Sequence, residues 1–127
     1  MRRLIDHSIG RIAVTSRALP AIVPVNYIVT GRTTIVFRTE MDGMLARAAD
    51  DTVVAFEVDE LAGDGRSGWS VLVVGVARHL EGSALTRALE GRVITAMGDG
   101  RDQFVAITIG QITGRIVEPN PSALAGV

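Results

Sequence analysis

Apolar, β-branched and aromatic residues fill two neighbouring runs, residues 22–30 and 33–38, which are separated by the turn residues Gly31 and Arg32. Runs rich in Val, Ile, Tyr, Phe and Thr and bounded by turn residues are typical of strands. The pattern therefore predicts a β-hairpin. Asp42 and Gly43 follow it and precede residues 44–49, which predict one or two helical turns.

Similar patterns predict further strands at residues 10–15, 52–59, 68–80, 104–109 and 111–117, with a turn over 16–21 and a loop over 61–67. Gly75 lies inside the longest of these runs. Glycine inside a strand often marks a bulge or bend, which closing a small barrel requires. Gly110 separates the last two runs and predicts a break between two strands.

Residues 83–90 predict a second helix, with Ser83 as N-cap and Gly91 at its end. Residues 92–102 are expected to form a loop, and residues 118–127 a mobile tail. Five to seven strands with two short helices predict a mostly β protein, a barrel with peripheral helices. The length predicts one domain over residues 1–117.

Composition narrows the function classes. The 127 residues carry 13 basic and 14 acidic side chains, and a net charge of −1 argues against a nucleic-acid partner. Cysteine is absent, which removes disulfides and thiolate chemistry. His7 and His79 lack ligand-spaced neighbours, so no metal site is expected.

No apolar run approaches the roughly 20 residues that span a bilayer, so no membrane association is expected. The residues after Met1 do not form a secretory signal, and we expect a cytoplasmic location. Several strands are apolar on both faces, and apolar residues make up 47% of the chain. One face would fill the barrel and the other would meet a second copy, which predicts a homodimer.

A candidate anion site follows the second strand of the hairpin. Arg38 ends this strand, Thr39 adds a hydroxyl, and Gly43 precedes the predicted helical turns. Arginine holds a phosphate through two parallel charge-assisted hydrogen bonds, and free N–H groups at a helix start favour an anion. The alternative is an ordinary hairpin with a surface arginine.

Four short motifs carry a family resemblance: Pro24-Val25-Asn26-Tyr27, Phe37-Arg38-Thr39, Phe56-Glu57-Val58-Asp59 and Gly68-Trp69-Ser70-Val71. In this order and spacing the chain resembles the pyridoxamine 5′-phosphate oxidase-like proteins, in particular their short actinobacterial branch, over roughly residues 9–117. The resemblance implies a split β-barrel homodimer that holds FMN at the subunit interface.

The resemblance also implies roles for individual residues. Arg38 and Thr39 match the pair that holds the phosphate, and Gly43 and Met44 match the helix start, where relatives commonly place a lysine at the Met44 position. Losing one charge-assisted contact costs roughly 1.5–3 kcal/mol, or about one to two decades of affinity. Glu40 and Asp42 flank the same place. Arg47 or an arginine of the partner subunit would compensate.

The flavin ring is expected along Pro24, Val25, Asn26 and Tyr27, whose strand edge offers N–H and C=O groups. Further cofactor contacts are expected from Trp69, Ser70 and Arg115. Three of these residues have an alternative structural role: Asn26 caps the hairpin, Tyr27 belongs to the core, and Trp69 belongs to the core or to the dimer contact.

The leading hypothesis is an FMN-dependent oxidoreductase that acts on a small molecule by hydride transfer, with the electron chemistry supplied by the flavin. No catalytic residue is identified, because Glu57 and Asp59 share a strand face that is more readily explained as solvated. Two alternatives stay open: a dimeric module for another cofactor such as the deazaflavin F420, and a non-catalytic regulatory or structural protein with a degenerate flavin site.

Overall fold

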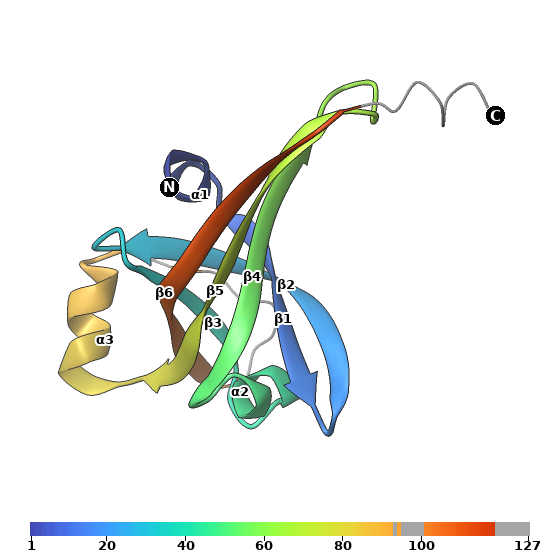
Figure 1. The fold of residues 1–127 in the computed structure, drawn as a ribbon. Coiled ribbons are helices and arrows are strands. Elements are labelled where there is room, and N and C mark those ends of the chain that lie inside the picture. The colour runs from blue at the N-terminus through green and yellow to red at the C-terminus, as the bar shows by residue number, and fades with distance from the viewer. Residues whose placement is uncertain (93, 95–100, 119–127) are drawn as a thin grey trace.

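The computed structural model describes residues 1–92, 94 and 101–118. Six antiparallel strands form a closed barrel in the order β1-β2-β3-β6-β5-β4, and three short helices lie around it (Figure 1). The elements are, in chain order, α1 Arg2–Asp6, β1 Ile9–Ser16, β2 Leu19–Thr30, β3 Thr34–Glu40, α2 Met44–Ala48, β4 Thr52–Leu61, β5 Gly68–Leu80, α3 Gly82–Leu89 and β6 Asp102–Val117.

The core fills the barrel and follows the two-residue alternation of the strands. Ile12 and Val14 of β1 point inward, as do Val54 and Phe56 of β4, and these side chains are almost completely buried. Leu4 of α1 and Leu45 of α2 join the same core. Figure 1 shows α1 and α2 at opposite ends of the barrel, so the two helices cover the ends that a sheet alone leaves open.

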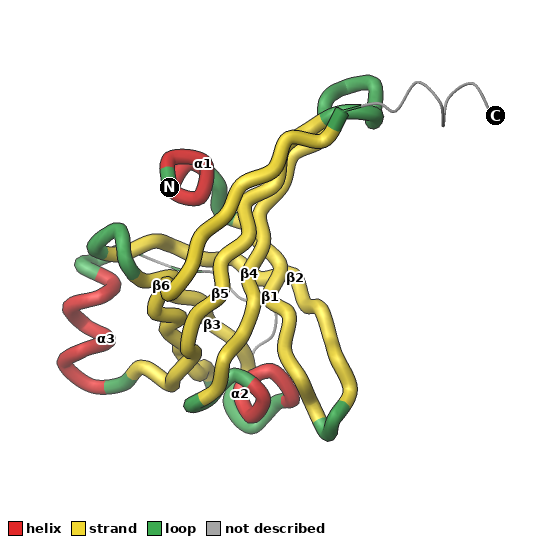
Figure 2. The backbone as a smooth tube through the Cα atoms, in the orientation of Figure 1, coloured by secondary structure: helices red, strands yellow, loops and turns green. Residues whose placement is uncertain are grey.

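Strands β4, β5 and β6 continue together beyond the barrel (Figure 2). We call this part the extension: residues 58–61 of β4, 68–71 of β5 and 114–117 of β6, which are joined in continuous antiparallel register. By contrast β1 and β4 share only three register pairs, from Arg11–Glu57 to Ala13–Ala55. The barrel is therefore closed by a short seam and opens into a long three-stranded arm.

Several sequence-based expectations need correction. Gly110 does not separate two strands, because β6 runs through it: Val74 pairs with Gln111 and Gly75 with Ile109, so Gly110 is the additional residue of a bulge. The bulge expected at Gly75 is present, but its additional residue belongs to the opposite strand, β6. Helix α3 begins at Gly82 with Glu81 as N-cap, so Ser83 is not the cap.

The turn expected over residues 16–21 is shorter than predicted. Only Arg17 and Ala18 form it, and β2 already begins at Leu19. Helix α1 adds a third short helix to the two that were expected. Most of the loop expected over residues 92–102, and all of the tail expected over 118–127 except Glu118, lie outside the described residues. Within the described residues, no helix has both the length and the apolar character needed to cross a bilayer.

Candidate functional site

Arg38 lies near the end of β3, on the outer side of the barrel and opposite Phe104 of β6. Its side chain is 24% exposed, and Nη1 lies 3.4 Å from Oδ2 of Asp102. Its Nε is buried and has no hydrogen-bond partner among the described residues. A buried donor without a partner costs about 1–3 kcal/mol. The guanidinium is therefore held in place by Asp102, while its Nε keeps an unused hydrogen-bond donor. An unused donor is the state expected of a group that receives a ligand.

The turn from β3 into α2 runs beside this arginine. Gly43 N–H donates to the Glu40 carbonyl at 3.2 Å, which makes residues 40–43 a tight turn, with Asp42 in the left-handed region at φ 65°. Asp42 Oδ2 lies 3.5 Å from Arg101 Nη2. The charge of Asp42 is therefore partly offset, and it opposes an anion near Arg38 less than the sequence alone suggested.

Within the described chain, one edge of β2 has no strand partner over residues 19–26, beside the end of β3 that carries Arg38. Residues 19–26 pair with β1, whereas pairing with β3 begins only at Tyr27. Tyr27 N–H donates to the Ser8 carbonyl. Because N–H groups alternate between the two edges of a strand, those of Asn26 and Ile22 face the open edge, as do the positions of Pro24 and Pro20. Proline tolerates this edge because it has no N–H to satisfy.

Asn26 continues the β2–β3 register to the position next to Arg38. Pro24 and Asn26 lie along the open edge of β2, Arg38 and Thr39 lie near the end of β3, and Gly43 and Met44 form the turn into α2. Met44 is 38% exposed at the start of α2. We call this set the β2–β3 group.

Tyr27 and Val25 are placed differently, because their side chains face the barrel interior. The Tyr27 ring packs edge-to-face on Phe56 at 4.9 Å, and its hydroxyl donates to the Leu4 carbonyl. Burial raises the pKa of Tyr27 to about 12. The side chains of Val25 and Tyr27 therefore belong to the core, and their N–H groups face β1 rather than the open edge of β2.

Trp69, Ser70 and Arg115 lie on the extension, at the other end of the sheet (Figure 1). Ser70 pairs with Arg115 and Arg38 with Phe104, and both partners are on β6. From Phe104 to Arg115 the strand runs roughly 35 Å at about 3.3 Å per residue. One small cofactor cannot touch both places within one protomer. We call Trp69, Ser70 and Arg115 the extension group.

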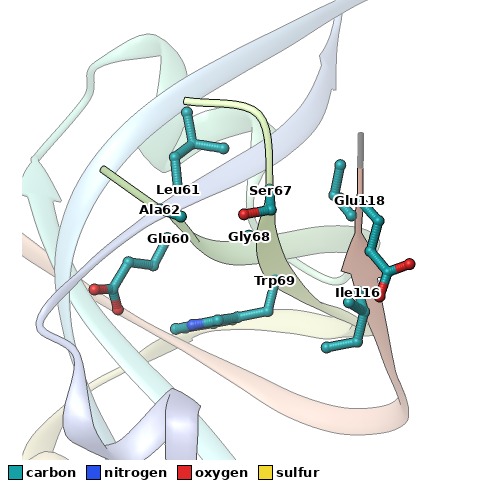
Figure 3. Close-up of a pocket in the computed structure, with 9 residues that line it drawn as sticks. Glu60, Leu61, Ala62, Ser67, Gly68, Trp69, Ile116 and Glu118 are labelled. Atoms are coloured by element: carbon teal, nitrogen blue, oxygen red, sulfur yellow. The ribbon is translucent and has the colours of Figure 1, made fainter. Parts of the chain in front are cut away.

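Trp69 fixes the N-terminal helix to the extension. Arg3 Cζ lies 4.6 Å from the indole centroid, and the His7 ring packs on it edge-to-face at 5.0 Å. His7 Nε2 lies 3.3 Å from Oε2 of Glu60. Trp69 of β5 pairs with Glu60 of β4 on one side and with Ile116 of β6 on the other. All three residues border a hollow of about 340 Å³ (Figure 3).

A cluster of charges that sequence patterns did not reveal lies on the outer face near Pro24. Arg11 Nη1 contacts Glu57 Oε1 at 3.0 Å and Asp59 Oδ1 at 3.2 Å. Burial and the neighbouring Asp59 raise the pKa of Glu57 above its usual 4.5. Glu57 and Asp59 are thus not simply solvated, as sequence reasoning favoured. Arg11 is distant in sequence and reaches them only because the barrel closes through β1 and β4.

The same face carries a row of apolar cross-strand partners. Ile22, Ala13, Ala55 and Val74 follow one another across β2, β1, β4 and β5. Ile22 is 71% exposed and Val53, further along β4, is 66% exposed. A hollow of about 300 Å³ lies between this row and the charge cluster. Contiguous exposed apolar surface of this kind marks an interaction site.

Together, a small antiparallel barrel, a half-paired strand and an unsaturated arginine beside it define a split β-barrel protein. The chain belongs to the pyridoxamine 5′-phosphate oxidase family, whose model matches residues 1–116. Both the family expected from the four motifs and the mostly β split-barrel fold are confirmed.

Individual relatives support this placement. The chain is 34% identical over 119 residues to an uncharacterized protein of Mycobacterium tuberculosis, Rv0080, covering 89% of this chain and 76% of the relative. An FAD binding protein from Mycobacterium smegmatis is similar in structure, with a TM-score of 0.80, 32% identity and coverage of 94% and 93% of the two chains. A conserved protein of unknown function from Corynebacterium diphtheriae gives a TM-score of 0.72, 25% identity and coverage of 91% and 90%.

Proposed function

We propose that this protein binds a flavin and acts as a flavin-dependent oxidoreductase that transfers hydride to or from a small molecule. The observation that carries the proposal is the half-buried Arg38 guanidinium, whose Nε has no partner among the described residues, beside the open edge of β2. A similar chain from Mycobacterium smegmatis is an FAD binding protein. FMN and FAD share the phosphate that this arginine would hold.

In this proposal the β2–β3 group holds the cofactor. Arg38 and Thr39 bind the phosphate next to the ribityl chain, and Arg38 has a donor to spare there. The open edge of β2 offers the Asn26 N–H and the Pro24 carbonyl to the polar rim of the ring. A bound flavin supplies the hydride chemistry, while the chain orients it and keeps water away.

The proposal includes a homodimer. The extension group lies too far from Arg38 to reach the same flavin within one protomer. A second copy brings its own extension to the β2–β3 group, so Trp69, Ser70 and Arg115 of the partner complete the site. The apolar row through Ile22 and Ala55 is the surface that the two copies bury.

Arg38→Gln tests the phosphate contact. Flavin affinity, measured by fluorescence titration of flavin-free protein, should fall about 10- to 100-fold, because a charge-assisted contact contributes about 1.5–3 kcal/mol. Arg32→Gln, in the exposed β2–β3 turn, is the matched control and should leave the affinity unchanged. Equal affinities for both variants and the wild type would remove Arg38 from the site.

Met44 favours a second candidate function, a weak or non-catalytic flavin site, because relatives commonly place a lysine here. Met44→Lys should tighten FMN binding about tenfold or more if the contact is missing. Titration with F420 in parallel identifies a deazaflavin module: F420 binding without flavin binding would overturn the leading proposal. Failure of bound flavin to be reduced by nicotinamide or chemical donors would favour the non-catalytic alternative.

A further inference from the structure

His7, which follows α1, joins the N-terminal helix to two strands of the extension. Its Nδ1 lies 2.7 Å from the Arg3 carbonyl oxygen within α1, and its Nε2 lies 3.3 Å from Oε2 of Glu60 on β4. The ring also packs edge-to-face on Trp69 of β5 at 5.0 Å. Figure 3 shows the Glu60 carboxylate and the Trp69 indole extending in the same direction from their neighbouring strands. Both ring nitrogens of His7 therefore face an oxygen atom.

These two oxygen atoms decide which form of His7 fits the geometry. A carbonyl and an ionised carboxylate only accept hydrogen bonds, so each contact requires a ring N–H. A neutral imidazole has one N–H and one bare nitrogen, whereas the imidazolium ion donates from both nitrogens. A neutral His7 that keeps the shorter contact, to Arg3, turns a lone pair toward the Glu60 carboxylate. Only the protonated ring satisfies both contacts, and it adds an attraction between opposite charges.

The groups around His7 differ in their effect on this proton. Glu60 of β4 favours the imidazolium ion, because its carboxylate is the partner of Nε2. The Arg3 guanidinium, whose Cζ lies 4.6 Å from the Trp69 centroid, opposes it. The Trp69 ring of β5 is uncharged. Histidine changes its charge between pH 5 and 8. The contact with Glu60 is therefore complete at the acidic end of this range and is lost at the alkaline end.

The two sides of α1 are held in different ways. Leu4 is fully buried, and its carbonyl accepts a hydrogen bond from the Tyr27 hydroxyl, which keeps its proton throughout this pH range. On the other side, Arg3 and His7 contact the Trp69 ring. A helix of five residues is too short to be stable by itself, so its contacts decide where it lies. We propose that protonated His7 is a positioning residue that holds α1 against Trp69, and that the helix loosens from the ring when His7 loses its proton.

Trp69 is the only tryptophan of the chain, so its fluorescence tests this inference without a flavin. Acrylamide quenching of the full-length protein, freed of any bound flavin and measured by fluorescence lifetime, gives the rate at which the quencher reaches the ring. This rate constant should rise about twofold from about pH 5.5 to about pH 8 in the wild type, the scale of an exposed ion pair. His7→Gln should give the higher value at both pH values, and His7→Lys, a permanent cation, the lower value at both.

Three further variants separate the proton on His7 from other causes. Glu60→Gln removes the charged partner and should reduce the change with pH to less than half. Arg3→Gln removes the other cation on the ring and should raise the rate constant while keeping its change with pH. His79→Gln removes the second histidine, which contacts α2, and should behave as the wild type. Thermal unfolding checks that each variant is folded.

Three results would overturn the inference. The first is a wild-type rate constant that is the same at both pH values. The second is a change with pH that persists in His7→Gln, and the third is a change that disappears in His79→Gln. None of these results bears on the flavin function, which the titration of Arg38→Gln tests separately.

Discussion

At the scale of single residues, Tyr27 reports on how the core is closed. It is the only tyrosine of the chain, and burial raises its pKa from 10.0 to about 12. The folded state holds this proton more tightly than the unfolded state. The contribution of Tyr27 to the free energy of unfolding is therefore fully present below pH 10 and is lost as the pH rises toward 12. Absorbance at 295 nm should therefore show little phenolate at pH 10.5 in the folded protein. Phenolate formation at pH 10 without unfolding would contradict this.

Glu57 gives a second pH dependence, at acidic pH. Burial, followed by the contribution of Asp59, raises its pKa above 4.5. Its proton is held more tightly in the folded state, so its contribution is present at low pH and is lost as the pH rises from 4.5 through the folded pKa. We expect Glu57→Gln to gain melting temperature relative to the wild type between pH 4.5 and 7. A difference that stays constant with pH would refute this.

At the scale of elements, the β5–β6 bulge depends on the close approach of two backbones. A Cβ atom added at Gly75 would lie 2.0 Å from the carbonyl oxygen of Thr108. Backbone atoms cannot yield as a flexible side chain does, so Gly75→Ala should lower the free energy of unfolding by about 1–3 kcal/mol. Gly63→Ala, in the exposed loop where no described atom lies within 4 Å, should change it by less than about 0.5 kcal/mol. Equal denaturation midpoints for the two variants would contradict this prediction.

The strands also show where local patterns succeed and where they fail. The bounds predicted for residues 68–80 agree with β5, because alternation and β-branched residues are local signals. The predicted break at Gly110 failed because glycine ends a strand or forms a bulge according to its partner strand. Ser83 failed as an N-cap because the helix already begins at Gly82, after Glu81 in extended backbone.

At the scale of the whole molecule, the apolar outer face predicts self-association. Ile22 is 71% exposed in the middle of this face. Burying such a side chain contributes about 1.5–3 kcal/mol. In a twofold interface Ile22 of each copy is buried, so the contribution is doubled. Ile22→Glu should therefore raise the dimer dissociation constant at least a hundredfold in analytical ultracentrifugation. Leu19→Glu, on the opposite face of β2, is the control.

The same variants connect assembly to the site. If the partner's extension completes the flavin site, Ile22→Glu should also weaken flavin binding, and raising the protein concentration should restore it. A wild type that is monomeric at micromolar concentration and still binds flavin fully would contradict both the dimer and the shared site.

The sequence by itself determined the family and most of the strands, and it predicted Arg38 as a phosphate-binding residue, because these inferences depend on alternation, propensity and short motifs. Only the tertiary structure decided which residues meet. It placed Tyr27 in the core, separated Trp69 and Arg115 from Arg38, and brought His7 to Trp69. The physical reason is that side-chain direction and neighbours follow from the pairing of strands distant in sequence, and single-chain patterns do not encode that pairing.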